Sequence, residues 1–440
     1  MTMPAPPRSF VFPPSRGRWL RRTACLLLAA VILAPVAAPA QSLLIPMDET
    51  QQDHLKAYGV AFHLLTRGVK VEWLLNYRGG SFLANYYADI ADTCDVRGVV
   101  YDAIGDAQVA AIKATIEDEN MESVLLEKAP AIAIYAPSGN EPWDDAVTLA
   151  LTYAQINYTV IWDEEVLNGD LDLYDWLHLH HEDFTGQYGK FYGSYRNELW
   201  YRQDVQMNEA MAQKLGFRKA SDLKLAVALT IKSYVTRGGF LFAMCSAPET
   251  LDIALAAGDV DIVPSPFDGD PPDPNCQAGL DYSRSMAFTD FTLSLDPNEY
   301  SHSDIDTSPD RISSRFNPAG DYFRLFEFSA KLDPVPTMLV QCHVDAVSGF
   351  MGQTTAFRKS LVKKYVILLG ENEGQNEVRY LHGNLDKGTF TFLGGHDPED
   401  YQHLIYDPPT ELALHKNSPG YRLILNNVLF PAARKKDRKT

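Results

Sequence analysis

Short apolar segments alternate with amphipathic ones near the start of the chain. Apolar stretches at 43–46, 69–75 and 99–101 flank helical patterns over 48–67 and 107–120. Apolar positions three and four apart indicate a helix, short apolar runs indicate strands, and strand-helix-strand units form parallel sheets. The pattern therefore predicts an N-terminal α/β section over residues 41–128.

The alternation continues through the rest of the chain. Further strands are predicted at 131–135, 158–162, 176–180, 240–244, 337–341, 365–369, 378–381 and 389–393, and further helices at 144–155, 223–236, 249–257 and 421–429. Alternating strands and helices favour the α/β class with a doubly wound, mainly parallel sheet, here formed by 129–263 and 331–430. Residues 264–330 are rich in proline near their start and have few long apolar runs, so an irregular insertion is predicted there.

The first 40 residues have the pattern of a secretory signal. Five arginines and no acid precede an apolar run from Ala24 to Val36, and Ala38-Pro39-Ala40 follows. A basic start, a short apolar run and small residues at the end indicate cleavage before Gln41. The run has about 13 residues, whereas a membrane-spanning helix needs about 20. The mature protein is therefore predicted to be exported, to the periplasm or the outside, without stable membrane insertion.

The net charge limits which partners the protein can bind, and the cysteine content bears on disulfide pairing. The formal charge is −18, and losing the five arginines of the signal takes it to −23. A strongly acidic protein repels nucleic acid and anionic lipid, so neither is a predicted partner. A small-molecule or carbohydrate ligand is a separate expectation, which does not follow from the charge. The basic residues of 431–440 are interpreted as a solvated tail. Four cysteines remain after cleavage, and their spacing leaves disulfide pairing open. The oligomeric state is also open.

Cys245 and His396 are the candidate catalytic pair. Cys245 follows the apolar strand 240–244 directly and precedes a predicted helix, which is where a nucleophile stands exposed above an α/β sheet. His396 comes just after the strand 389–393, and Asp397 and Glu399 follow it closely. A cysteine nucleophile needs a histidine base, and the histidine needs a carboxylate to orient it. Cys245 as an inert buried residue is the alternative.

A second polar group ends the strand predicted at 176–180. The sequence there reads Leu177-His178-Leu179-His180-His181-Glu182-Asp183. His180, His181, Glu182 and Asp183, together with Gly394-Gly395, are the predicted substrate-binding residues. Imidazole and carboxylate groups are ligands for zinc, manganese or iron, so His180, His181 and Glu182 are also candidate ligands of a divalent metal, the only cofactor predicted. A hydrogen-bonded polar network that caps the sheet is the alternative interpretation.

The order of these motifs resembles class I glutamine amidotransferase-like proteins. Gly238-Gly239, a strand, Cys245, a helix and a late Gly395-His396 match that pattern over roughly 130–430, with an insertion at 264–330. The stretch 388–397 is more similar to the ThuA-like branch. The resemblance implies a flavodoxin-like sheet. The chain departs from it because Ala243 and Ala247 replace the glycines around the nucleophile, and because His396 and Glu399 are three positions apart rather than two.

The whole chain resembles an exported bacterial family whose members are often named asparagine synthetase B. The matching stretches are 53–59, 180–187 and 395–401. Asparagine synthesis itself is not expected, because the mature chain does not begin with cysteine and lacks a Ser-Gly-Gly-x-Asp-Ser loop for ATP. Three functions follow as hypotheses: a thiol-dependent amide or ester hydrolase using Cys245 and His396, a non-catalytic ThuA-like carbohydrate-binding protein, and a metal-dependent hydrolase using His180, His181 and Glu182.

Overall fold

The structure is a computed structural model that describes residues 41–137, 145–311, 322–333, 335–372, 374–400 and 407–433. The predicted signal (1–40) and most of the predicted basic tail therefore lie outside the described residues. Within the described part, no helix combines the length and apolar character that crossing a bilayer requires. The cysteines of this part, Cys94, Cys245, Cys276 and Cys342, are all free thiols.

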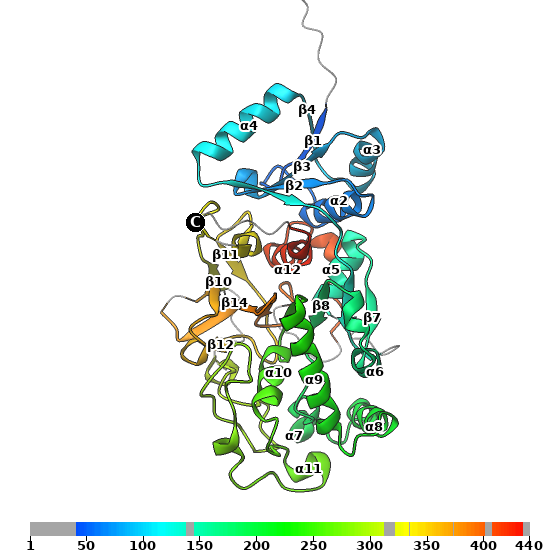
Figure 1. Ribbon diagram of the computed structural model, residues 1–440, viewed down its shortest axis with the longest axis vertical. Coiled ribbons are helices and arrows are strands. Elements are labelled where there is room, and N and C mark those ends of the chain that lie inside the picture. Colours follow the sequence, from blue (N-terminus) through cyan, green and yellow to red (C-terminus); the bar gives the residue numbers. More distant parts are fainter. Residues whose placement is uncertain are drawn as a thin grey trace, which may run out of the picture. The chain divides into compact units, whose positions relative to one another are not determined.

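The N-terminal section forms a five-stranded antiparallel sheet with three helices (Figure 1). Its strands stand in the order β4-β1-β3-β2-β5. The elements are β1 (Ser42–Ile45), α2 (His54–Thr66), β2 (Val71–Leu75), β3 (Ser81–Asn85), α3 (Ala88–Arg97), β4 (Asp102–Ile104), α4 (Asp106–Asp118) and β5 (Glu122–Leu126). Successive strand residues point to opposite faces, so Leu43 and Ile45 pack in the core with α2, whereas Leu44 packs with Ile112 and Ile116 of α4.

The prediction of a parallel sheet in this section is wrong. β1 and β2 do run in the same direction, but β3 lies between them and pairs antiparallel with both. Such a split β-α-β arrangement belongs to ferredoxin-like topologies. The strand β3 was missed because Gly79-Gly80-Ser81 has the composition of a loop, and the strand starts directly at Ser81. β4 starts three residues after the predicted start at Val99.

The second sheet contains ten strands and is mixed. Its elements are β6 (Ile132–Tyr135), α5 (Ala146–Ala154), β7 (Thr159–Ile161), α6 (Asp163–Asn168), β8 (Trp176–Leu179), α7 (Tyr192–Tyr195), α8 (Leu199–Lys214), α9 (Ala220–Arg237), β9 (Phe240–Met244), α10 (Ala247–Ala256), α11 (Ser265–Asp268), β10 (Tyr322–Leu325), β11 (Ala346–Ser348), β12 (Phe357–Arg358), β13 (Ile367–Glu371), β14 (Glu377–Leu385), β15 (Gly388–Leu393) and α12 (Pro419–Leu429). The chain is therefore an α/β protein, as predicted.

Only half of this sheet is parallel. The order is β11-β10-β13-β14-β15-β9-β8-β6-β7; the strands from β15 to β7 are parallel, and those from β11 to β15 pair antiparallel. The prediction of a mainly parallel sheet therefore needs correction. β14 and β15 are joined by Asp386-Lys387 alone, and a connection of two residues can only join antiparallel neighbours. The strand predicted at 337–341 is instead largely a 3₁₀ helix, Val335–Val340, because a short apolar run does not by itself distinguish a strand from helical structure.

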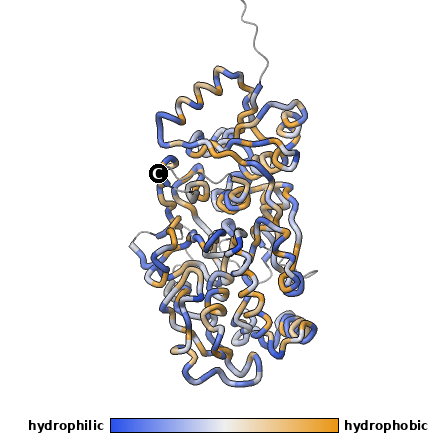
Figure 2. Tube along the Cα trace, in the orientation of Figure 1, coloured by the Kyte–Doolittle hydropathy of each residue, from blue (hydrophilic) through white to orange (hydrophobic). Residues whose placement is uncertain are grey.

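Helices cover both faces of the parallel half. α5 and α12 pack with α2 over one face, where Ile132, Ile134 and Trp176 point. α6, α9 and α10 cover the other face, where Leu177 and Leu241 point. Apolar and polar residues alternate along the trace throughout (Figure 2), which is the pattern of layers that each bury one face. The described residues of 257–311 carry only short helical turns and run across the α10 side of the sheet.

One buried cation joins the two sheets. Arg422 of α12 is fully buried, and its guanidinium donates to the carbonyls of Met47 and Gly79 and to Nδ1 of His343. The His343 ring stacks on that of His54, with 4.4 Å between ring centroids. Burial, together with the charge of Arg422, lowers the pKa of His54 to about 4. The folded protein therefore holds His54 neutral.

Acidification is expected to destabilise the protein through His54. The unfolded chain takes up a proton on His54 below its ordinary pKa of 6.5, whereas the folded chain does so only near 4. Stability from this group is complete above pH 6.5 and is lost as the pH falls to about 4, at about 1.4 kcal/mol per pKa unit, so by about 3 kcal/mol. Urea unfolding of the wild type and of His54→Gln at pH 7 and 4.5 checks this. His415→Gln, which removes a half-exposed histidine paired with Glu399, is the comparison; an equal loss in all three proteins would contradict the prediction.

Candidate functional site

The candidate site is at the C-terminal ends of the parallel strands β8, β9 and β15. Cys245 follows β9, His180 follows β8, and His396 comes three residues after β15. β9 lies between the other two strands, so these residues converge on one edge of the sheet. Ligands of open α/β sheets bind outside this edge.

Cys245 has a strained backbone. It lies between β9 and α10 with φ of +55°, a left-handed conformation that is uncommon for any residue other than glycine. Its N–H is shared between the carbonyls of Leu393 and Gly395, at 3.2 and 3.1 Å. Ala243 and Ala247, two positions away on either side, are fully buried. The turn is therefore fixed by the residues at the end of β15. A strained turn of this type can expose a nucleophile above the sheet, but Cys245 is buried here, so the predicted exposure is wrong.

The Cys245 thiol is 1% exposed and surrounded by backbone donors. Burial raises its pKa to about 11, and the N–H groups of Thr354, Gln353 and Ser246 act in the opposite direction by hydrogen bonding to the sulfur. The resting residue is therefore a neutral thiol, and it needs a base to become a nucleophile. The same three N–H groups can stabilise negative charge that develops beside the sulfur.

Gly352 lies close to both Cys245 and His396. A Cβ built on Gly352 would lie 3.2 Å from Cys245 Sγ, 3.1 Å from His396 Cβ and 2.9 Å from His396 N. The loop around Gly352 is held down by His396 N–H, which donates to the Met351 carbonyl, and by Gly395 N–H, which donates to the Thr354 carbonyl. The loop therefore crosses directly over Cys245 and His396 and helps to bury the thiol.

The structure gives the two predicted orienting carboxylates other contacts. Asp397 Oδ2 accepts the Tyr421 hydroxyl at 2.5 Å, and Oδ1 accepts the Glu399 N–H at 2.8 Å. Glu399 pairs with His415 at 3.0 Å. Both acids thus fasten the turn after β15 to its surroundings.

Asp145 is the carboxylate that the sequence analysis missed. It caps the N-terminus of α5, where Oδ1 accepts the N–H groups of Val147 and Thr148. The same Oδ1 lies 3.4 Å from His180 Nδ1, and Oδ2 lies 3.4 Å from His178 Nε2. Although burial acts in the opposite direction, the neighbouring imidazoles of His180 and His178 hold the pKa of Asp145 well below its usual range. Its position before an apolar helix is the only local signal for this residue.

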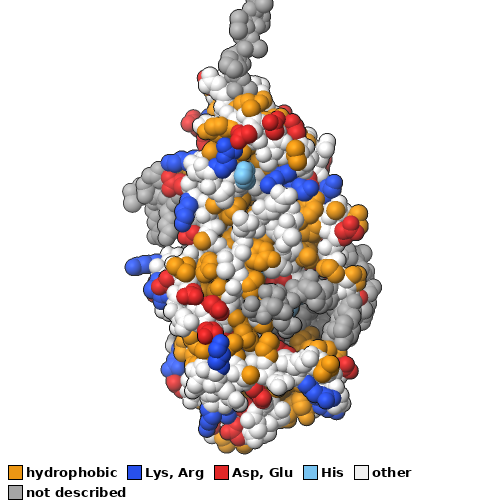
Figure 3. Space-filling view, turned by 90° about the vertical axis from the view of Figure 1, so that its right-hand side faces the viewer, with side chains coloured by type: hydrophobic (Ala, Val, Ile, Leu, Met, Phe, Trp, Pro, Cys, Tyr) orange, Lys and Arg blue, Asp and Glu red, His pale blue; other side chains and the backbone are white. Residues whose placement is uncertain are grey.

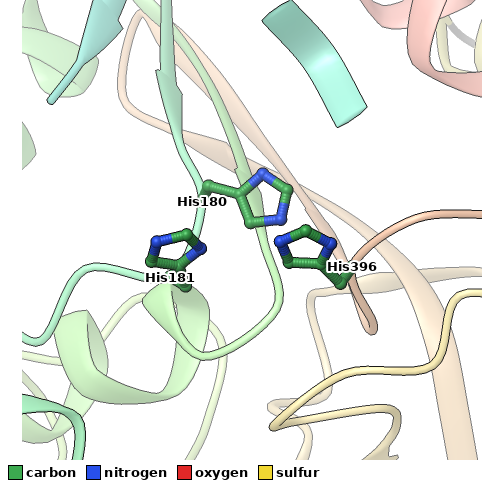
Figure 4. Close-up of side chains that lie close together, drawn as sticks. All are labelled: His180, His181 and His396. Atoms are coloured by element: carbon green, nitrogen blue, oxygen red, sulfur yellow. The ribbon is translucent and has the colours of Figure 1, made fainter. Parts of the chain in front are cut away.

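His180, His181 and His396 form a cluster (Figure 4). One ring nitrogen from each can be chosen so that all three lie within 4.8 Å of one another, and the His180 and His396 ring centroids are 4.1 Å apart. β8 ends at Leu179, so His180 and His181 are not constrained to opposite faces of a strand. The His180 carbonyl accepts Ala247 N–H at 3.2 Å, which docks this turn on α10.

The other predicted binding residues have mainly supporting roles in the structure. Glu182 folds back so that Oε2 accepts the N–H of His180 at 2.7 Å, and burial raises its pKa to about 7. Asp183 accepts the N–H groups of Thr185, Gln187 and Gly189 and pairs with His302, which organises the loop beyond β8. The third histidine of the cluster is thus His396, and Glu182 is not a member of it.

Comparison with known proteins gives only distant structural likeness. No protein-family model and no curated protein matches the chain. Two cytoplasmic proteins of Salmonella typhimurium align with 70% and 69% of this chain and 100% of their own, at 10% and 11% identity and TM-scores of 0.33 and 0.32. An exo-β-1,4-mannosidase of Opitutaceae bacterium strain TAV5 aligns with 65% of this chain and 33% of its own, at 12% identity and a TM-score of 0.25. Function therefore has to be argued from the site.

Proposed function

We propose that the protein is a thiol-dependent hydrolase of amide or ester bonds, with Cys245 as nucleophile and His396 as base. One observation carries the proposal: Cys245 has a left-handed φ of +55° at a strand-to-helix turn beside the turn that holds His396. A non-glycine residue in this conformation costs about 1–3 kcal/mol and is concentrated at functional sites.

The sheet supports placement among class I glutamine amidotransferase-like proteins. In chain order the five parallel strands are β6, β7, β8, β9 and β15, and their spatial order is 2-1-3-4-5. That is the flavodoxin-like order, in which sites form at the carboxyl ends of the strands. We also propose that the chain belongs to the exported family often named asparagine synthetase B, without that activity.

On the face shown in Figure 3, basic side chains lie in small separate groups beside acidic ones, which suits a small neutral ligand better than a polyanion.

The chemistry proceeds in two steps. His396 removes the thiol proton as Sγ attacks the carbonyl carbon, and the N–H groups near the sulfur stabilise the oxyanion. The amine or alcohol leaves with the proton held by His396, and a thioester on Cys245 remains. Water then attacks the thioester with His396 again as base, which releases the acid and restores the thiol. Asp145 is a positioning residue that does not contact the reacting atoms. It pairs with His180, and the His180 ring lies against the ring of His396.

Trapping the thioester tests the proposal. Protein mixed with p-nitrophenyl acetate and quenched in acid is expected to carry one acetyl group on the peptide that contains Cys245, located by mass spectrometry. Hydroxylamine should remove it, as it does a thioester. The same sample contains the controls, because Cys94, Cys276 and Cys342 should remain unmodified. Acetylation spread over these cysteines, or absent from Cys245, would refute the nucleophile and leave the ThuA-like binding hypothesis as the better account.

A further inference from the structure

We infer that His180, His181 and His396 form a binding site for a divalent transition-metal ion, with zinc the best fit. The inference rests on the arrangement of the imidazoles and not on the proposed thiol chemistry. Imidazole nitrogen suits zinc, copper, iron and nickel, and three histidines with an open position are a common set for zinc.

The donor geometry is close to that of a bound ion. The three ligand nitrogens lie within 4.8 Å of one another. Zinc–nitrogen bonds of about 2.0–2.1 Å in a tetrahedral site place nitrogens about 3.3 Å apart, so modest side-chain rotations would close the site. Figure 4 shows that the three rings already converge, two from the end of β8 and one from the turn after β15.

His180 provides the independent sign that a ligand is expected here. Its side chain is fully buried, and neither Nδ1 nor Nε2 has a hydrogen-bond partner among the described residues. A buried polar atom without a partner destabilises the folded protein, so its retention needs an explanation. A metal ion that accepts the lone pair of Nε2 would supply one.

Asp145 sets the direction of that lone pair. Its Oδ1 lies 3.4 Å from His180 Nδ1 without a hydrogen bond between them, so a small rotation of the ring would give Nδ1–H a carboxylate acceptor and leave Nε2 as the donor atom. A carboxylate behind a metal-binding imidazole is the usual outer arrangement of zinc sites, where it fixes both tautomer and orientation. The second oxygen of Asp145 faces His178 Nε2, and His178 Nδ1 contacts the Phe242 carbonyl at 3.1 Å, so the support extends into the sheet.

Metal binding and base catalysis exclude each other at His396. A ring nitrogen whose lone pair binds the metal cannot also accept the thiol proton of Cys245. Zinc should therefore inhibit the proposed hydrolase reversibly, and a chelator such as EDTA should restore it. The cluster would then act as a metal-controlled switch on the same site, a regulatory role that the proposed hydrolase activity does not by itself require.

Cobalt(II) titration tests the site directly. The mature protein should bind one cobalt ion per chain, with the intense visible absorption of a tetrahedral centre, and zinc should displace it. His181→Ala, at a partly buried position, should weaken binding at least 100-fold, and Asp145→Asn, which removes only the outer contact, by about 10–100-fold. His63→Ala on α2 is the matched control and should bind like the wild type.

The outcomes separate this inference from the proposed function. The titration is repeated on Cys245→Ala, which has no thiol chemistry; unchanged cobalt binding there supports the metal site whether or not the hydrolase proposal holds. Circular dichroism confirms that each variant is folded. Absence of stoichiometric binding to the folded wild type, or binding that His181→Ala leaves unchanged, would overturn the inference.

Discussion

Replacing Cys245 by alanine is expected to lower kcat/KM for p-nitrophenyl acetate by about 10³-fold or more, because the covalent route is then closed. His396→Gln removes the base that a buried thiol with a pKa of about 11 requires, and a loss of about 10²–10⁴-fold is expected. The two residues act in one step, so the double variant should be no slower than the slower single variant.

The matched control for this kinetic test is Cys276→Ala. Cys276 is also a buried free thiol, but it lies in the 3₁₀ turn 276–279 of the excursion that follows α10. Its removal should change kcat/KM less than twofold, a bound set by the small effect expected of a substitution away from the reacting atoms. Multiplicative losses in the double variant would show that Cys245 and His396 work independently, which the mechanism forbids.

Replacing Gly395 by alanine is expected to destabilise the protein by about 3 kcal/mol or more and to abolish hydrolysis. Gly395 has φ of +88°, and a Cβ there would lie 1.6 Å from the Phe350 carbonyl oxygen. The added atom combines backbone strain with a clash that only a shift of the 350–355 loop can relieve. Because that loop supplies N–H groups to Cys245, the shift also dismantles the surroundings of the thiol.

The Gly216→Ala variant separates the cost of backbone strain from the cost of the steric clash. Gly216 has nearly the same φ, +84°, but a Cβ there would meet nothing within 4 Å. It should therefore cost only the backbone strain, about 1 kcal/mol, and leave activity intact. Thermal or urea unfolding of both variants gives the comparison. Equal destabilisation in the two would mean that the close approach of Phe350 has no energetic role.

The sequence was most informative where local pattern and tertiary environment agree. β9 has the bounds predicted for it, because a strand buried on both faces is a continuous apolar run, and Cys245 follows at once. The positions of Cys245 and His396 at strand ends followed from the same local signals. Because β9 and β15 are parallel neighbours, their C-terminal ends lie at the same edge of the sheet.

Features that depend on which strands become neighbours were not predictable in this way. The contact of Asp145 with His180 requires β6 to pair with β8, and nothing near either residue records that pairing. The position of β3 between β1 and β2 likewise depends on which strands pair with each other in the folded sheet. Glu182 shows a third limit: its residue type suits a metal ligand, but hydrogen bonding of its side chain to the nearby N–H of His180 directs it elsewhere.

The position of β9 between β8 and β15 has a consequence for the newly made chain. β8 is complete before β9 is synthesised, but β15 begins only at Gly388, so one edge of β9 stays without its partner through most of the remaining synthesis. The apolar sequence Phe240-Leu241-Phe242-Ala243-Met244 is of the type that pairs with other chains when left open at an edge. Fragments that stop before Gly388 should therefore aggregate, and a chaperone that shields unpaired strands would matter most during this interval.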